Sequence, residues 1–418
     1  MYLENLCKQT KKACGSLYLT DISVIDKALK EIASKLIERA EFIKEQNKID
    51  LENAVKKGMT EAFIDRLTLS DKVINSMAEG LIQVSNLTSP IDKKEYEYVN
   101  KEQEIEIEKI FVPFGVVGMI YESRPNVTID AFALCFKTKN AVVLKGGSDG
   151  LYSNKALVEI IKSVLKENGI DENAVNLIED TSRETTVKFM KMDKYLDLLI
   201  PRGSKKLIQS VTENSTVPTI ETGAGNCHVY VDAYADIDKA VKVIYNAKTQ
   251  RYGVCNACES LVIHKDILEK VLPKIADSFL EKKIEIRADE RAYQVINDYP
   301  YLRKATEEDF YAEYDDAIIS VKTVDCICVA IDHINEHSTK HSESIITEDS
   351  SRADKFISLI DSSAVYHNAS TRFSDGFVFG LGAEIGISTQ KLHARGPMGL
   401  NALVTTKYVV KGDGAVRK

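Results

Sequence analysis

The sequence has no tryptophan, and none of its apolar runs is long enough to cross a bilayer. The amino-terminal residues lack the apolar stretch of a secretory signal, and the eight cysteines are too scattered to form a disulfide framework. These absences predict a cytoplasmic chain that does not enter a membrane. The net charge of -8 and the missing indole rings also argue against a nucleic-acid partner.

The sequence contains instead an alternation of short apolar runs with helical patterns. Its 418 residues exceed what one hydrophobic core usually organises, so two or three domains are expected. Residues 21–57 carry apolar side chains at helical spacing, which predicts that the chain opens with an amphipathic helix ending at Gly58. Further along, five apolar runs with helical patterns between them predict a mostly parallel, doubly wound sheet. These runs are 114–122, 141–145, 174–178, 195–200 and 217–221.

A second alternating unit starts near residue 226, where another apolar run is again followed by a helical pattern. Two further segments have the pattern of an exposed β-ribbon. Residues 95–111 alternate polar and apolar side chains, and residues 402–418 contain a strand pattern followed by a turn. Because an isolated ribbon is only marginally stable, these segments are expected to pair with each other and with another subunit, which predicts a homo-oligomer.

The dinucleotide-binding fingerprint GxGxxG is absent after the first of these strands. Gly203 and Ser204 stand between a strand and a helix, where backbone N–H groups can face a phosphate, although the same pattern also forms an ordinary helix cap. Lys145 ends a predicted strand and can reach a ribose or a phosphate, although a lysine there is also commonly solvated. Because parallel sheets bind ligands beyond the carboxyl ends of their strands, the candidate loops are 122–126, 145–150, 201–204 and 221–226.

Cys255 and Cys258 lie three positions apart in the segment QRYGVCNACES. They admit three readings: a nucleophile, a metal or redox pair, or buried thiols. A zinc site needs a second ligand pair, but Cys326 and Cys328 have CxC spacing in place of the usual CxxC. A thioredoxin-like couple belongs after the first strand of a small fold, not in mid-chain. The sequence therefore predicts no metal site, and inert buried thiols are expected at Cys7, Cys14, Cys135, Cys227, Cys326 and Cys328.

Four strings in the chain, 112–149, 218–232, 254–257 and 370–410, carry a family resemblance. They read VPFGVVGMIYESRPNV and onward, PTIETGAGNCHVYVD, VCNA, and STRFSDGFVFGLGAEIG and onward. These strings resemble the gamma-glutamyl phosphate reductases, also called glutamate-5-semialdehyde dehydrogenases, and the match runs over nearly the whole chain. The family belongs to the aldehyde dehydrogenase superfamily, whose members bind a nicotinamide cofactor without the glycine fingerprint. The resemblance thus accounts for the missing motif.

The resemblance implies an α/β fold of the aldehyde dehydrogenase type. Two doubly wound parallel-sheet domains are expected, together with a small β oligomerisation ribbon. The implied parts are a cofactor-binding domain of residues 1–94 and 112–225, a catalytic domain of residues 226–385, a ribbon of residues 95–111 and 402–418, and a segment, 386–401, that returns toward the cofactor domain.

The resemblance also implies roles for individual residues in the chemistry. Cys255 matches the nucleophile that becomes acylated, so the spacing to Cys258 is a coincidence. Glu221 matches the glutamate that begins the glycine-containing loop of the superfamily, and it acts as a base in aldehyde-oxidising relatives; its plain alternative is a loop carboxylate that faces water. The oxyanion is expected to be held by the backbone N–H of Cys255 and by a side chain of ESRPN, and the choice between Asn126 and Arg124 stays open.

Further residues are implied for the cofactor and the substrate. Lys145, Gly203, Ser204 and Glu313 match positions that bind the cofactor, NADPH or NADP. The residues before VCNA read RYG where the family is expected to carry Pro and Ser, so the approach to the nucleophile differs here. Arginines in strings specific to the family are expected to bind the substrate phosphate and carboxylate: Arg124, Arg372 and Arg395.

The implied reaction is the NADPH-dependent reduction of L-glutamate 5-phosphate to L-glutamate 5-semialdehyde and phosphate through a cysteine thioester. This is the second step of proline biosynthesis from glutamate, and functional coupling to a glutamate 5-kinase is expected. Two alternatives remain: an acylating aldehyde dehydrogenase for another activated acyl group, and a non-enzymatic zinc or redox-sensing scaffold. The preference for NADP over NAD, the number of subunits and the role of Glu221 in the reductive direction are left open.

Overall fold

The computed structural model describes residues 2–122 and 124–417, and the chain divides into two compact units. The division falls after residue 222, which differs from the predicted boundary between 225 and 226. The segment 386–401, predicted to return to the cofactor domain, is shared between the two units.

None of the described helices has both the length and the apolar character needed to span a membrane. Unit 1 comprises Met1–Thr222, Gly380–Gly386 and Met398–Lys418, and unit 2 comprises Gly223–Phe379 and Ile387–Pro397.

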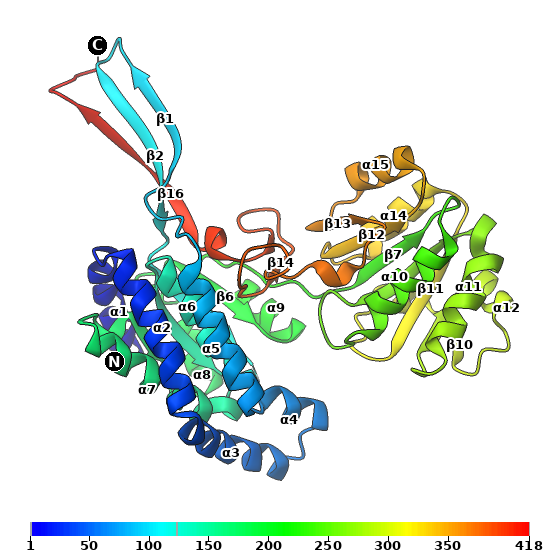
Figure 1. Ribbon diagram of the computed structural model, residues 1–418, viewed down its shortest axis with the longest axis horizontal. Helices are drawn as coiled ribbons and strands as arrows, with labels where there is room; N and C mark the ends of the chain where they lie inside the picture. Colours follow the sequence, from blue (N-terminus) through cyan, green and yellow to red (C-terminus); the bar gives the residue numbers. More distant parts are fainter. Residues whose placement is uncertain (1, 123, 418) are drawn as a thin grey trace. The chain divides into compact units, whose positions relative to one another are not determined.

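Unit 1 opens with a helical layer, blue in Figure 1: α1 (Tyr2–Tyr18), α2 (Ile22–Glu38), α3 (Ala40–Lys56), α4 (Glu61–Leu67) and α5 (Asp71–Asn86). The prediction of one opening helix over 21–57 is wrong in two respects, because α1 precedes it and a break divides it. The break is at Arg39, whose backbone (φ -101°, ψ 23°) is not helical. As predicted, the helical segment ends at Gly58, which has φ of 68°, a left-handed conformation that glycine adopts at little steric cost.

A parallel sheet follows, with its strands in the order β5-β4-β3-β6: β3 (Val116–Tyr121), β4 (Ala141–Gly146), β5 (Val175–Leu177) and β6 (Leu198–Arg202). Each strand overlaps one of the predicted apolar runs, and helices lie between them or follow: α6 (Asn126–Lys137), α7 (Leu151–Glu167), α8 (Arg183–Phe189) and α9 (Lys205–Asn214). The fifth predicted strand, 217–221, is wrong. It makes only an isolated bridge between Leu199 and Thr219. Pro218 has no N–H to donate, so a regular ladder cannot form through it.

Different helices cover the two faces of this sheet, because side chains alternate along each strand. On one face, Val116 and Ile120 of β3 join a buried cluster with side chains of α1, α8 and α9. On the other face, the hydroxyl of Tyr121 lies 2.6 Å from the hydroxyl of Thr128 in α6. Unit 1 therefore has the doubly wound α/β architecture that the sequence predicts.

A three-stranded antiparallel ribbon belongs to unit 1 and has the order β1-β2-β16: β1 (Lys94–Asn100), β2 (Ile105–Pro113) and β16 (Val404–Gly412). The predicted pairing of the two ribbon segments is confirmed, since β16 pairs with β2 in continuous register from Val404 to Gly412. The ribbon extends away from the helices of unit 1 in Figure 1. Tyr96, Tyr98 and Tyr408 are exposed on it. Pairing of this ribbon with another subunit stays a prediction.

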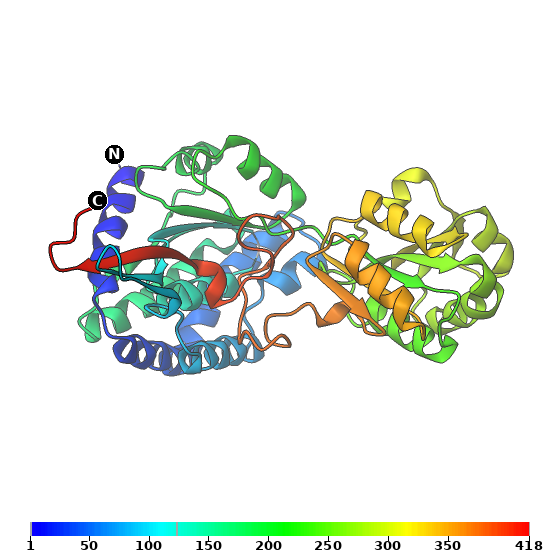
Figure 2. The same ribbon diagram turned by 90° about the horizontal axis from the view of Figure 1, so that it is seen from above.

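Unit 2 is built on a larger parallel sheet of order β10-β9-β11-β8-β7-β12-β13. Its strands are β7 (Cys227–Val231), β8 (Cys258–His264), β9 (Glu285–Ala288), β10 (Leu302–Lys304), β11 (Ile318–Val324), β12 (Ser342–Ile346) and β13 (Ala364–His367). Its main helices are α10 (Ile237–Thr249), α11 (Lys265–Phe279), α12 (Glu290–Val295), α14 (Ile327–His337) and α15 (Ser350–Leu359). Val229 and Val231 pack with α10 and α11 on one face, and Tyr230 packs with α14 and α15 on the other. Figures 1 and 2 show these helices on both sides of the sheet.

Candidate active site

The two cysteines of the QRYGVCNACES segment lie in different environments. Cys255 is half-buried in the turn between α10 and β8, whereas Cys258 is the fully buried first residue of β8. The Cys258 thiol donates to the carbonyl oxygen of Ser260 at 3.4 Å, and burial raises the pKa of Cys258 to about 12. A buried, protonated thiol is a poor nucleophile. This geometry favours Cys255 as the reactive thiol of the segment, and its nucleophilic role stays a prediction.

The main chain at Cys255 is held by the glycine-containing loop that leads into β7. The Cys227 thiol donates to the carbonyl oxygen of Cys255 at 3.1 Å. A Cβ added to Gly225 would lie 1.5 Å from the same oxygen, so only glycine permits this approach of the two backbones. The carboxylate of Glu313 accepts a 2.5 Å hydrogen bond from the Gly225 amide. The predicted cofactor residue Glu313 is thus attached to the loop that contacts the predicted nucleophile.

Arg372, one of the predicted substrate-binding arginines, interacts electrostatically with Cys255. Its Nε donates to Oε1 of Gln250 at 2.9 Å. Burial lowers the pKa of Arg372, and the positive charge of Arg251 acts in the same direction. The interactions of Arg372 with Cys255 and Asp375 oppose this shift. A guanidinium group therefore lies within electrostatic reach of the predicted nucleophile.

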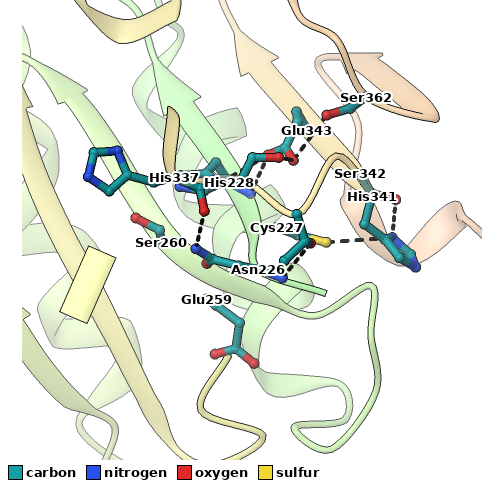
Figure 3. A network of polar contacts seen from close by, with 12 residues as sticks. Asn226, Cys227, His228, Glu259, Ser260, His337, His341, Ser342, Glu343 and Ser362 are labelled. Carbon is teal, nitrogen blue, oxygen red and sulfur yellow. Dashed lines mark hydrogen bonds and ion pairs between the residues drawn. The ribbon is translucent and has the colours of Figure 1, made fainter. Parts of the chain in front are cut away.

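A buried polar network lies beneath this loop (Figure 3). The Cys227 sulfur is 3.7 Å from Nδ1 of His341, and that nitrogen is 2.8 Å from the hydroxyl of Ser342. The Asn226 amide donates to the carbonyl oxygens of Phe310 at 2.8 Å and of His337 at 3.0 Å. Because burial raises the pKa of Cys227 well above its usual value, its thiol remains a hydrogen-bond donor. The network is connected to the Cys255 turn through the hydrogen bond from the Cys227 thiol to the carbonyl oxygen of Cys255.

This cluster lies at the amino ends of β7, β8 and β12, which begin at Cys227, Cys258 and Ser342. The loop 221–226 was expected at the carboxyl end of a fifth strand of the first sheet. That expectation is wrong, since no fifth strand forms and the loop enters β7 at its amino end. The loops 122–126, 145–150 and 201–204 do follow the carboxyl ends of β3, β4 and β6, as expected.

The loop after β6 forms a helix cap. The Ser204 hydroxyl accepts from the amide of Leu207 at 3.4 Å, and the Ser204 amide donates to Oε2 of Glu122 at 2.8 Å. A Cβ on Gly203 would lie 2.5 Å from that oxygen. The amino end of α9, which we expected to face a phosphate, is thus covered by a carboxylate of ESRPN. A cofactor role for Gly203 and Ser204 stays a prediction that requires this carboxylate to move.

Lys145 differs from the solvated lysine that is common at a strand end, because it is buried at 3% exposure. Its Nζ donates to the carbonyl oxygen of Gly146 at 3.3 Å. Burial lowers the pKa of Lys145, and the negative charge of Asp180 opposes this effect. A buried ammonium group gains from an added anion or hydroxyl acceptor, so Lys145 suits the ribose or phosphate contact that the resemblance implies.

The segment ESRPN leads into α6 and contains both candidates for the oxyanion contact. The Asn126 amide donates to Oδ2 of Asp130 at 3.1 Å, one turn further along the helix. Arg124 is half-buried just before the helix begins. Burial raises the pKa of Asp130 to about 6, while the Asn126 hydrogen bond and the charge of Arg202 lower it. The choice between Asn126 and Arg124 stays open, and Ser123 lies outside the described residues.

Asp130→Asn is expected to stabilise the chain at neutral pH but not in acid. The folded-state pKa of Asp130 lies above the ordinary aspartate value, so the folded chain binds more protons than the unfolded chain between about pH 4 and 6. Stability is lost as pH rises through this window, and the neutral amide avoids that loss. Thermal unfolding at pH 4.5 and 7.5 is expected to give a gain of about 1–2 kcal/mol only at the higher pH.

The control for this prediction is Asp193→Asn, because Asp193 is exposed. It is expected to leave the unfolding temperature unchanged at both pH values. An equal gain from Asp130→Asn at pH 4.5 and 7.5 would contradict the assignment.

The two remaining predicted residues are Arg395 and Glu221. Nη2 of Arg395 pairs with Oδ1 of Asp361 at 2.9 Å, and Lys391 and Lys340 share the other carboxylate oxygen. These cations lower the pKa of Asp361. Arg395 thus forms an ion pair with Asp361, and its substrate role stays a prediction. Glu221 is half-buried and lies one residue before Thr222, where the first segment of unit 1 ends. Its catalytic role stays a prediction.

The expectation of inert buried thiols is wrong for Cys328, which is exposed and accepts from Nζ of Lys355 at 3.1 Å. Cys14 and Cys326 are half-buried. The reason is that Cys326 and Cys328 lie at the start of α14, on its outer side. Within residues 2–122 and 124–417, no group of three or more His, Cys, Asp or Glu side chains is arranged to hold a metal ion. The other cysteines of that expectation are buried: Cys7, Cys135 and Cys227.

Two residues near the predicted nucleophile were not identified from the sequence. Gln250 anchors the side chain of Arg372, and Asn256 donates to the carbonyl oxygens of Arg372 and Ser374. The only signal for either was its place in the same short segment as Cys255. Sequence spacing does not reveal these contacts, because Arg372 is 116 residues from Asn256.

Known proteins that are similar to this chain belong to one family. The model of the aldehyde dehydrogenase family matches residues 3–295. A gamma-glutamyl phosphate reductase of Clostridium acetobutylicum is 51% identical over 417 residues, covering 100% of this chain and 99% of the relative. One of Lachnospira eligens is 54% identical with the same coverage. The crystal structure of gamma-glutamyl phosphate reductase from Thermotoga maritima has a TM-score of 0.96 and 46% identity and covers all of both chains. The predicted resemblance and fold class are confirmed, and the chain belongs to the gamma-glutamyl phosphate reductases, oxidoreductases of the aldehyde dehydrogenase family.

Proposed function

We propose that this chain reduces L-glutamate 5-phosphate to L-glutamate 5-semialdehyde and phosphate, with NADPH as the reductant. The observation that carries the proposal is the environment of Cys255. Its side chain lies in a half-buried turn, its carbonyl group is held by Cys227 and Gly225, and the guanidinium group of Arg372 lies within electrostatic reach. These features suit a thiolate that attacks an anionic, activated acyl group.

The proposed chemistry takes place in two steps on Cys255. The thiolate attacks the acyl carbon of the substrate, a C–S bond forms, and the bond to the phosphate oxygen breaks, so that phosphate leaves and a thioester remains. The cofactor, when bound, supplies a hydride to the thioester carbon. The resulting thiohemiacetal collapses, the C–S bond breaks, and the aldehyde is released as the thiol is restored. No water is consumed in this direction, so Glu221 is not needed to activate one.

Several groups of the site are proposed to stabilise the negative charges that form during the reaction. Arg372 is suited to stabilise the thiolate and the departing phosphate, because a guanidinium group forms paired hydrogen bonds to oxyanions. The carbonyl oxygen of the substrate becomes negative in both steps. We assign its stabilisation to the backbone N–H of Cys255 and to Asn126 or Arg124.

Members of the aldehyde dehydrogenase family use a nicotinamide cofactor. We propose NADPH and assign Lys145, Gly203, Ser204 and Glu313 to its binding. The buried ammonium group of Lys145 fits this role, because it donates to the carbonyl oxygen of Gly146 at 3.3 Å and can bind a further acceptor. The Ser204 amide fits only if Glu122 releases it.

The biological setting is proposed from the substrate. Reduction of L-glutamate 5-phosphate is the second step of proline biosynthesis from glutamate, and we propose that the chain acts in the cytoplasm. An acyl phosphate hydrolyses readily in water, so functional coupling to the glutamate 5-kinase that forms it would protect the substrate. The exposed tyrosines of the β1-β2-β16 ribbon suit a contact with a second copy of the chain.

The proposed function is tested in the reverse direction, with glutamate 5-semialdehyde and phosphate. Oxidation is expected to require phosphate and to be at least about tenfold faster with NADP than with NAD, in line with a cofactor preference of roughly 1.4 kcal/mol. The measurement is the absorbance of the reduced nicotinamide. Coenzyme A in place of phosphate serves as the comparison, because acylating aldehyde dehydrogenases use it. Activity with coenzyme A and none with phosphate would contradict the proposal.

A further inference from the structure

Asn256, the residue after Cys255, connects the turn of the predicted nucleophile to the segment of Arg372. Its buried Nδ2 donates to the carbonyl oxygen of Ser374 at 2.9 Å and to that of Arg372 at 3.3 Å. In the opposite direction, Oγ1 of Thr371 donates to the carbonyl oxygen of Asn256 at 2.7 Å. Hydrogen bonds in both directions therefore join two segments that are more than a hundred residues apart in the sequence.

The Arg372 segment depends on outside donors because of its short length. It forms a single 3-10 turn, Thr371–Phe373, whose amino end is capped when the Arg372 amide donates to the hydroxyl of Ser370 at 3.3 Å. The amides of Phe373 and Ser374 donate to the carbonyl oxygens of Ser370 and Thr371, so the local bonds of the turn end at Thr371. Asn256 donates to the next carbonyl oxygen, that of Arg372, and to that of Ser374, and Gln250 accepts from Nε of the Arg372 side chain. Arg372 is thus fixed at both its main chain and its side chain.

We infer that Asn256 is a positioning residue, which holds Arg372 where its guanidinium group stabilises the thiolate of Cys255. The inference rests on the proposed function, since only an attacking Cys255 needs to be a thiolate. Oδ1 of Asn256 is buried and has no hydrogen-bond partner among the described residues. An unpaired buried oxygen destabilises the fold. Stability alone therefore does not account for an amide side chain at position 256. The two hydrogen bonds that Nδ2 donates to the Arg372 segment do account for it.

The thiolate of Cys255 is surrounded by several other ionisable groups. Cys227 lies beneath it and is held protonated by burial. Glu313 is bound to the neighbouring Gly225 amide, and Arg251 and Asp375 have opposite charges near Arg372. The buried groups next to Cys227 on the same side are His341 and Glu343, and those next to Cys258 are Lys248 and Glu259. Arg372 interacts electrostatically with Cys255, so its position contributes to the charge balance at the sulfur.

The test is the pH dependence of Cys255 alkylation by iodoacetamide, which is an uncharged reagent that needs no arginine for binding. The full-length chain is used without substrate, and the adduct on Cys255 is quantified by peptide mass spectrometry. In Asn256→Ala, the pH of half-maximal rate is expected to rise by about one unit, with roughly tenfold slower alkylation at pH 7. Arg372→Gln is expected to cause at least the same shift. A role of Arg372 in substrate binding alone would leave alkylation unchanged.

Two further variants separate positioning from a general loss of stability. Thr371→Val removes the bond to the Asn256 carbonyl and is expected to give a smaller shift in the same direction, whereas Thr371→Ser keeps the hydroxyl and the wild-type profile. Thr371→Val also carries the test if Asn256→Ala fails to fold. The matched control is Asn335→Ala, which removes an amide that bonds Leu359 and Asp361 elsewhere in unit 2. It is expected to leave the profile unchanged.

Wild-type alkylation profiles in both Asn256→Ala and Thr371→Val would overturn the inference, even if turnover fell. A shift in Asn335→Ala equal to that in Asn256→Ala would also overturn it, because the effect would then come from loosening of unit 2. If the wild-type chain shows no phosphate-dependent oxidation but the profiles shift as expected, the proposed function fails while the relation between Asn256 and Arg372 stands.

Discussion

Cys255→Ala is expected to abolish the reduction of L-glutamate 5-phosphate while the chain stays folded. The methyl group cannot form a thioester, so the loss of turnover is expected to exceed about 10⁴-fold. Cys255 is half-buried in a turn, and alanine keeps the backbone carbonyl group to which Cys227 donates, so the substitution is expected to have little effect on stability. Turnover is measured with NADPH, and the fold is checked by thermal unfolding.

The matched control is Cys258→Ala, three residues away. This change removes a buried sulfur from the first position of β8 and leaves a small cavity, at a cost of about 1 kcal/mol. Turnover is expected to remain close to the wild-type rate. Equal losses in the two variants would favour the paired-cysteine alternative over a single nucleophile.

The thioester itself provides a direct observation. When wild-type chain is mixed with L-glutamate 5-phosphate in the absence of NADPH, intact mass is expected to rise by one glutamyl group, and peptide analysis is expected to place it on Cys255. In Cys255→Ala the mass is expected to remain unchanged. An adduct on any other side chain would contradict the proposed mechanism.

Gly225→Ala is expected to have the second largest effect, because an added Cβ would lie 1.5 Å from the carbonyl oxygen of Cys255. The neighbour is a backbone atom and cannot move aside by rotation about a side-chain bond. Either the 221–226 loop or the turn of Cys255 must shift. A displacement of about 1 Å at a reacting group reduces turnover by roughly 100-fold, and overpacking costs about 1–3 kcal/mol of stability. Turnover and thermal unfolding measure the two effects separately.

The control for this change is Gly80→Ala, within α5. A Cβ at Gly80 meets no atom within 4 Å, and alanine favours a helix over glycine. Gly80→Ala is therefore expected to raise stability by about 0.5–1 kcal/mol with unchanged turnover. Wild-type turnover in Gly225→Ala would show that the contact with Cys255 is not needed for the reaction.

The fold was largely predictable because its main signals are local in the sequence. The apolar runs around Val117, Val143 and Leu199 predicted the strands β3, β4 and β6, since buried parallel strands read as short continuous apolar segments. The prediction failed at 217–221, where an apolar run reads as a strand but Pro218 cannot donate to a ladder. It also failed at Arg39, where the helical spacing continues across a break in the backbone.

The candidate site was predictable only in part. The strings that resemble the family identified Cys255 and Arg372, and the chain contains both in one unit. The same strings did not show that Arg395 pairs with Asp361. They did not show that Glu122 covers the amino end of α9, because that carboxylate and the Ser204 amide are 82 positions apart.

The sequence by itself determined the alternation of strands and helices, the ribbon and the family, because these depend on side-chain periodicity and on long matching strings. Only the tertiary structure decided which of two neighbouring cysteines is accessible. It also decided that Asn256 binds the segment of Arg372, and that Gly225 touches the carbonyl group of Cys255. The physical reason is that burial and hydrogen bonding depend on neighbours brought together by the register of β7 and β8 and by long loops, and residue spacing along the chain does not encode those neighbours.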